Sequence, residues 1–166
     1  MRSHDTDIFR RLAFLFVFPI VFASCGGGGD GGVVQPPGTT PTVVTKFAAL
    51  DNTQEVPPTI SAAKGGGILA FDSVTRGISG FVVTSGIGTR GNNAHIHVGA
   101  RGAAPPQNVI VQMFSADGEH WFLKDGEVLP AANVADFNAG NLYYNVHTPA
   151  PGGFPGGEIR GQIDLP

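Results

Sequence analysis

Three segments in the second half of the chain alternate strictly between apolar and polar side chains. They are Ala94–Val98, whose polar positions are both histidines, Leu142–His147 and Glu158–Ile163. Because successive side chains of a strand point to opposite faces, each segment has one apolar and one polar face. This pattern is typical of an antiparallel sheet with one face on the core. If the three strands are neighbours, their polar faces form one patch.

Four further β-type runs and one helical segment are predicted between clusters of turn residues. The runs cover Val43–Leu50, Gly67–Asp72, Ile78–Thr84 and Val109–Phe114, and turn residues at 65–67, 86–88, 91–93 and 151–157 separate the strands. The helix is expected at Pro130–Asn138, with Gly140 beyond its end as the C-cap. Seven short strands and one short helix predict an all-β fold, an antiparallel Greek-key β-sandwich or barrel.

The first 25 residues have a different apolar pattern. Two arginines precede the apolar run Leu12–Ser24, which ends at Cys25. As a helix this run would rise only about 20 Å, too little to cross a hydrocarbon core of about 30 Å. A basic flank, a short apolar stretch and small residues predict a secretory signal. Ala23 and Ser24 resemble a lipobox, in which the cysteine becomes the lipidated first residue; the alternative is an ordinary signal peptide with an unmodified cysteine.

The segment Gly26–Thr42 is rich in glycine and proline and has no hydrophobic period, which predicts a flexible tether. The expected organisation is a lipoprotein signal peptide over 1–24, a lipidated Cys25 and tether over 25–42, and one β domain over 43–166. The expected location is the cell envelope, as a membrane-anchored lipoprotein. The outer membrane or cell surface is favoured, because glycine rather than aspartate follows the cysteine.

The charge balance excludes some partners. The chain carries 10 Lys and Arg against 13 Asp and Glu, a net charge of −3, and has no basic run. This argues against nucleic acid or anionic lipid as a partner. Membrane attachment is expected to come from the N-terminal lipid rather than from surface charge. Cys25 is the only cysteine, so no disulfide forms within the chain.

Three histidines are the candidate metal ligands. His95 and His97 lie two residues apart on a predicted strand, so both imidazoles project from the same face. Both can reach one ion, because imidazole nitrogen binds zinc at about 2.0–2.1 Å. His147 is on the polar face of another strand and becomes the third ligand if the sheet brings it close. Copper or zinc suits three imidazoles. The alternative is structural, with each ring hydrogen-bonded to a backbone carbonyl or hydroxyl group.

Three charged residues are interpreted as structural, namely Glu55, Glu158 and Arg160. Arg160 is expected to pair with one of the two glutamates on the outer face of the last strand. The sequence shows no nucleophile elbow, Ser-His-Asp arrangement or phosphate-binding glycine motif, so no catalytic residue is predicted and the chain is expected not to be an enzyme. The expected function is a binding or structural module for an extracellular protein or small ligand. The alternative is copper or zinc binding with a redox role.

Four segments occur in an order typical of one family. They are Leu50–Pro58, Ala94–Gly102, Leu142–Thr148 and Gly156–Ile163, and they resemble the CHRD domain family, named after chordin. The resemblance spans about Val43 to Leu165. It implies an extracellular β-sandwich module and brings no settled biochemical activity. A looser similarity to Cu/Zn superoxide dismutase rests only on the His-x-His spacing on a strand, since the bridging-histidine loop, aspartate ligand and disulfide of that enzyme have no counterparts.

Overall fold

The computed structural model describes residues 42–104 and 108–166. The predicted signal peptide, Cys25 and the predicted tether up to residue 41 lie outside the described residues. One antiparallel sheet of eight strands dominates the fold, in the order β5-β4-β7-β8-β1-β2-β3-β6. The strands are β1 (Val43–Asp51), β2 (Lys64–Asp72), β3 (Ile78–Ser85), β4 (Asn93–Val98), β5 (Val109–Gln112), β6 (His120–Phe122), β7 (Leu142–His147) and β8 (Ile159–Gln162).

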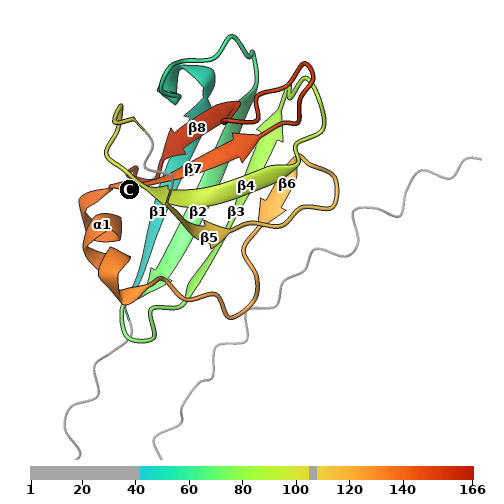
Figure 1. Cartoon of the computed structure of the whole chain (residues 1–166). Coiled ribbons are helices and arrows are strands. Elements are labelled where there is room, and N and C mark those ends of the chain that lie inside the picture. Colours follow the sequence, from blue (N-terminus) through green and yellow to red (C-terminus); the bar gives the residue numbers. More distant parts are fainter. Residues whose placement is uncertain (1–41, 105–107) are drawn as a thin grey trace, which may run out of the picture. The chain divides into compact units, whose positions relative to one another are not determined.

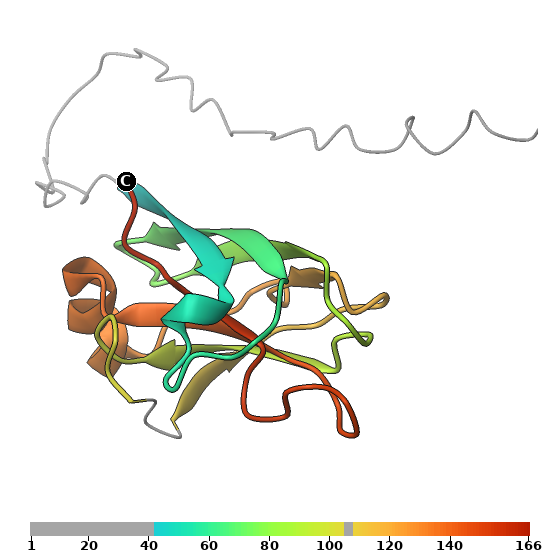
Figure 2. The same ribbon diagram turned by 90° about the horizontal axis from the view of Figure 1, so that it is seen from above.

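The sheet curls until its two halves face each other. Figure 2 shows β1, β2 and β3 on one side of the core and β4, β5 and β7 on the other. An antiparallel bridge between Phe114 and Phe122 joins the chain after β5 to β6, so the two edges meet at one point. The all-β antiparallel class with one short helix is therefore confirmed, as a curled half-barrel. Its core includes the fully buried side chains Leu50, Leu69, Ile96, Leu142, Ile159 and Ile163.

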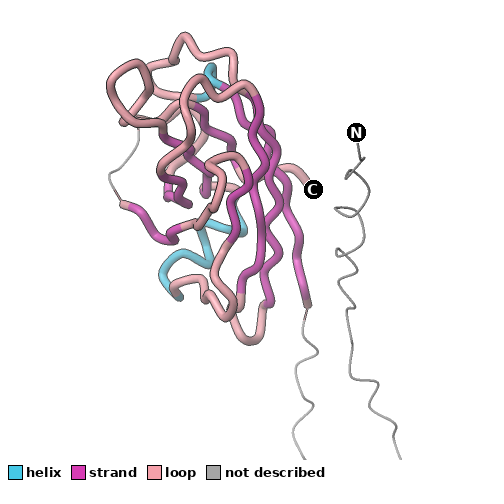
Figure 3. The backbone as a smooth tube through the Cα atoms, turned by 90° about the vertical axis from the view of Figure 1, so that its right-hand side faces the viewer, coloured by secondary structure: helices cyan, strands magenta, loops and turns pink. Residues whose placement is uncertain are grey.

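The helical segment begins with the 3-10 turn η3 (Ala131–Asn133) and continues as α1 (Val134–Ala139). Gly140 caps it in the left-handed conformation, with φ 73°, as the sequence predicts. Phe137 packs against Phe71 of β2, with ring centroids 4.8 Å apart. Lys46 donates to the carbonyls of Phe137 and Asn138 at 2.6 and 3.1 Å, so a cation lies at the C-terminal end of the helix. Figures 1 and 3 show α1 and η2 (Asn52–Gln54) at opposite ends of the strands.

The strand prediction was wrong at the start of β2 and missed β6. Gly65 and Gly66 were expected to form a turn, but β2 runs through them. Part of the glycine run accommodates core packing: a Cβ on Gly65 would lie 2.9 Å from the Val83 carbonyl oxygen, and one on Gly67 would lie 2.8 Å from the ring of Tyr144, whose hydroxyl donates to the Ile68 carbonyl at 2.8 Å. Glycine therefore makes room for a large buried side chain. The short strand β6 was missed, because three residues are too few to show an alternating pattern.

The polar face of the central strands is buried, which the sequence pattern did not predict. The strands β4, β7 and β8 are buried on both faces, and Glu158 and Arg160 are 2% and 1% exposed. The expectation that these two charges lie on an open outer face was wrong, because loops at the η2 end cover it. Over the described residues, no helix is long and apolar enough to span a bilayer.

Candidate metal centre

The three predicted ligand residues converge. His95 and His97 project from β4, and His147 is at the end of β7, the strand that pairs with β4. In the register of these strands Asn93 is opposite His147, so His147 is diagonal to His95 across the sheet. One ring nitrogen from each histidine lies within 4.8 Å of the others. The expected convergence is therefore confirmed, and alternation in two neighbouring strands is its cause.

The separation of two of these nitrogens matches a shared ion. The Nδ1 atom of His95 lies 3.3 Å from the Nε2 atom of His147. Two nitrogens bound to one tetrahedral ion at about 2.0–2.1 Å are about 3.3–3.4 Å apart. A separation of up to 4.8 Å to His97 exceeds the span of two ligands on one ion, which is at most about 4.2 Å at these bond lengths. A small rotation of His97 would close the site.

His147 is oriented by the loop that follows β7. Its Nδ1 atom lies 3.0 Å from the carbonyl oxygen of Pro155, to which an Nδ1–H donates. In a neutral ring this leaves Nε2 without a proton, with its lone pair directed towards His95. A carbonyl that fixes the tautomer and the ring of a ligand histidine is the usual outer shell of a metal site.

Among the described residues, neither ring nitrogen of His97 has a hydrogen bond of good geometry, although the side chain is only 7% exposed and the backbone of Asn108 lies close by. Its ring stacks on Tyr143, with centroids 5.1 Å apart and planes 8° from parallel, and meets His95 edge to face. Leaving a buried polar atom unpaired costs about 1–3 kcal/mol. The structural alternative, a ring tied to its own carbonyl or hydroxyl, therefore describes His147 but not His97.

The surroundings keep all three imidazoles neutral. Burial lowers the pKa of His97 to about 4, helped by the charges of His95, His147 and Arg160 and weakly opposed by the backbone of Asn108. Burial, together with His147, also lowers the pKa of His95, and burial lowers the pKa of His147. Only a neutral imidazole has a lone pair for a metal. The site is therefore ready to bind an ion at neutral pH without first releasing protons.

Arg160 supports this face from the far side of Tyr143. Its guanidinium carbon lies 3.6 Å from the centre of the Tyr143 ring, in the range of a cation–π contact. Its two terminal nitrogens donate to the carbonyls of Ala100 and Ala103 at 3.0 Å each. Among the described residues it forms no ion pair with a glutamate, so the predicted pairing was wrong. Its planar fork holds the loop after β4 instead.

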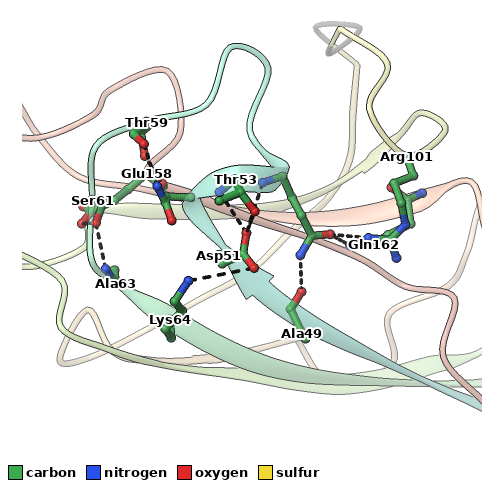
Figure 4. A network of polar contacts seen from close by, with 12 residues as sticks. Ala49, Asp51, Thr53, Thr59, Ser61, Ala63, Lys64, Arg101, Glu158 and Gln162 are labelled. Atoms are coloured by element: carbon green, nitrogen blue, oxygen red, sulfur yellow. Dashed lines mark hydrogen bonds and ion pairs between the residues drawn. The ribbon is translucent and has the colours of Figure 1, made fainter.

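Glu158 holds two other loops. Its carboxylate accepts hydrogen bonds from Ser61 and Thr148 at 2.6 Å each, and its carbonyl accepts one from Thr59 at 2.9 Å. Figure 4 shows the contacts with Ser61 and Thr59, which belong to the loop between η2 and β2. Nearly a hundred residues separate these partners in sequence. Glu158 therefore joins the covering loops to the strand beside the histidines.

Glu55 is 5% exposed, and burial raises its pKa to about 7 against the opposing charge of Arg160 and a hydrogen bond from Asn145. Its Oε2 atom accepts from Asn145 at 3.4 Å, while its Oε1 atom and the Oδ1 atom of Asn145 have no partner. Both of these oxygens lie within 2.7 Å of the position that a Cβ on Gly157 would take. A protonated Glu55 satisfies both, because its hydroxyl can donate to Asn145.

Two residues of this face were not singled out from the sequence, Tyr143 and Asn145. Their signal was present, because both occupy polar-face positions in the alternating segment that ends at His147. The fourth histidine of the described residues, His120, is exposed on β6 and contacts Asp117 at 2.7 Å, apart from the three-histidine group.

The comparisons with known proteins give one family. The model of the CHRD domain matches residues 47–163. No curated protein and no solved structure matches the chain.

Proposed function

We propose that this chain, which belongs to the CHRD domain family, binds one copper or zinc ion through His95, His97 and His147. The observation that carries the proposal is the convergence of three neutral imidazoles, two of them with nitrogens 3.3 Å apart. Without an ion, an Nδ1–H of His95 can donate to Nε2 of His147, but His97 would remain unpaired in a buried space. An ion would bind all three rings and give His97 the partner that it lacks.

The donor set favours copper or zinc over harder ions. Imidazole suits both metals, whereas magnesium and calcium prefer oxygen ligands. No fourth His, Cys, Asp or Glu joins the group within the described part of the chain. Three protein ligands with one open position are typical of metal sites that take a further ligand. We therefore propose a site that binds a small anion or water as its fourth ligand, with a redox role if the ion is copper.

The proposed role is binding rather than catalysis. The charged residues beside the site hold loops: Arg160 donates to two backbone carbonyls, and Glu158 accepts from two hydroxyls. Neither is free to move a proton. These contacts of Arg160 and Glu158 support a non-enzymatic module. It would carry a metal ion and present its loops to an extracellular protein or small ligand.

Metal analysis of the protein purified without an affinity tag tests the proposal. We expect one copper or zinc ion per chain, and a loss of affinity of about 100-fold or more in His97→Ala. His120→Ala is the matched control, because this histidine is exposed and outside the group. Equal affinities of the wild type and His97→Ala for both metals would exclude the three-histidine site.

We further propose that the domain is displayed outside the cytoplasm on a lipid attached to Cys25, favouring the outer membrane or cell surface. The support is the apolar run that ends at this cysteine and the glycine-rich segment behind it. Cys25→Ser should move the protein from the detergent phase to the aqueous phase, or leave the precursor uncleaved. Unchanged detergent partitioning of this variant would exclude the anchor.

A further inference from the structure

A row of apolar side chains crosses the outer face of the sheet on the side away from the histidines. Its members face one another in the registers of neighbouring strands, so the row is continuous. In this order they are Leu165, Phe47, Ile68, Phe81, Phe122 and Phe114, here named the aromatic row. The four phenylalanines and Leu165 are 44–55% exposed. At about 4.8 Å per strand, the row is about 24 Å long.

Two open hollows accompany the aromatic row. One, of about 550 Å³, has the glycines 65–67 as its floor and Phe47, Phe81 and Val83 at its sides. Gly66 leaves it open, because a Cβ there would meet nothing within 4 Å. The other, of about 590 Å³, lies at Phe114 and Phe122. Lys64 borders the first hollow and Lys124 the second. The surface is therefore apolar along its middle and carries cationic side chains at its margin.

The size of the aromatic row argues against a stable protein partner. About half of each phenylalanine is exposed, so at about 200 Å² per side chain the four rings offer on the order of 400 Å². A stable interface buries about 800 Å² on each partner. A second copy of this chain, which would pack the same row against itself, buries too little. Binding to a lipid surface needs no such minimum buried area, because each ring that inserts contributes independently to the binding free energy.

The position of the aromatic row in the chain, close behind the proposed anchor, also favours a lipid bilayer as its partner. The segment 26–42 leads directly into β1, which carries Phe47. Seventeen residues reach at most about 60 Å when extended, so a chain held at Cys25 keeps the row close to the bilayer. The whole chain is acidic and has no basic run, so an electrostatic attraction to anionic lipid is excluded as the main force.

We propose that the aromatic row rests on the bilayer surface, with its rings in the headgroup–acyl boundary and Lys64 and Lys124 among the headgroups. This inference rests on the proposed lipid anchor, which would keep the domain close to the bilayer. It fixes the orientation of the domain, because the row and the histidines belong to opposite halves of the curled sheet. The metal centre then faces away from the membrane, towards soluble ligands.

Fluorescence quenching in vesicles tests the orientation in the acylated full chain. Phe81→Trp places a probe in the aromatic row, and Ile60→Trp, at a position 95% exposed and off the sheet, is the matched control. In vesicles of brominated phosphatidylcholine, we expect the probe at 81 to lose roughly half of its emission, since interfacial faces lie about 5–10 Å deep. The probe at 60 should be unaffected. Equal quenching of the two probes would overturn the proposal.

A second experiment separates this proposal from the anchor. The Cys25→Ser chain has no lipid, so its partition into phosphatidylcholine vesicles reports the aromatic row alone. Phe81→Asp with Phe122→Asp should lower the partition coefficient at least about tenfold, and added salt should not. Ile60→Asp should change nothing, and unchanged thermal melting will show that both variants fold. Equal partition of all forms, or a dimer that the aspartates dissociate, would overturn the proposal. The lipid anchor is tested separately, by the detergent partitioning of Cys25→Ser.

Discussion

The buried carboxyl of Glu55 predicts an unusual pH dependence of stability. Burial raises the pKa of Glu55 to about 7, from an ordinary value of 4.5. Between these values the folded protein holds a proton that the unfolded chain has released. Stability therefore falls as the pH rises from about 4.5 through 7 and levels off above it, the opposite of the usual carboxylate in an ion pair. A difference of about 2.5 in pKa corresponds to about 3 kcal/mol.

Glu55→Gln measures this effect directly. Glutamine is neutral at every pH, and its amide can donate to the Oδ1 atom of Asn145 that lacks a partner. The variant should match the wild type near pH 4 and exceed its unfolding free energy by about 3 kcal/mol near pH 8. Urea denaturation across this range gives both curves. The three histidines, whose pKa values are lowered, affect both proteins alike, so they cancel in the difference.

The control is Glu119→Gln, which removes the same charge from an exposed position. Its difference from the wild type should stay within about 0.5 kcal/mol at every pH. If Glu55→Gln behaves like this control, the carboxyl is ionised in the folded protein at neutral pH. The reciprocal contact with Asn145 would then be wrong, and a bound cation or water would have to occupy the space beside Gly157.

Three further predictions follow from the same face. Affinity for zinc, measured by calorimetry, should hold from pH 8 to 6.5 and disappear towards pH 4, where His97 takes up a proton because burial lowers its pKa to about 4. Arg160→Lys should lower the unfolding free energy by about 2–4 kcal/mol, because lysine loses the two hydrogen bonds and the stacking on Tyr143. The control Arg101→Lys, at an exposed ion pair, should lower it by less than about 1 kcal/mol. Equal losses in the two variants would contradict this prediction. Gly157→Ala, at φ 124° with side-chain atoms within 2.8 Å, should cost over about 2 kcal/mol in denaturation, and Gly156→Ala, with open space around it, nearly nothing.

The convergence of the histidines could be predicted because it depends on local periodicity. Alternation fixes the face of each side chain along a strand, and only the adjacency of the two strands had to be added. The pairing of β4 with β7 supplies it, with Ile96 opposite Tyr144 on the core side and His97 opposite Tyr143 on the other. The same argument explains why Tyr143 and Asn145 belong to the site.

The burial of this polar face could not be predicted, because it depends on loops whose partners are distant in sequence. The contact of Ser61 with Glu158 spans 97 positions, and that of Arg160 with Ala103 spans 57. No local pattern encodes such contacts. An alternating pattern of apolar and polar residues predicts a half-exposed strand, whether a loop or water covers its polar face. The prediction of an exposed Glu158–Arg160 pair failed for this reason.

The unpaired polar atoms of the covered face connect its stability to its function. Among the described residues, seven have buried side-chain atoms without a partner, and five of them, Glu55, His97, Tyr143, Asn145 and Gln162, lie on or beside this face. One proton on Glu55 satisfies two of them, and one ion satisfies His97. An ion that binds only the folded protein stabilises it by about 2.7 kcal/mol at a hundred times its dissociation constant. If the proposed ion binds, the metal-free domain should therefore unfold at a lower temperature than the loaded one, and the ion would help to hold the loops over this face in place.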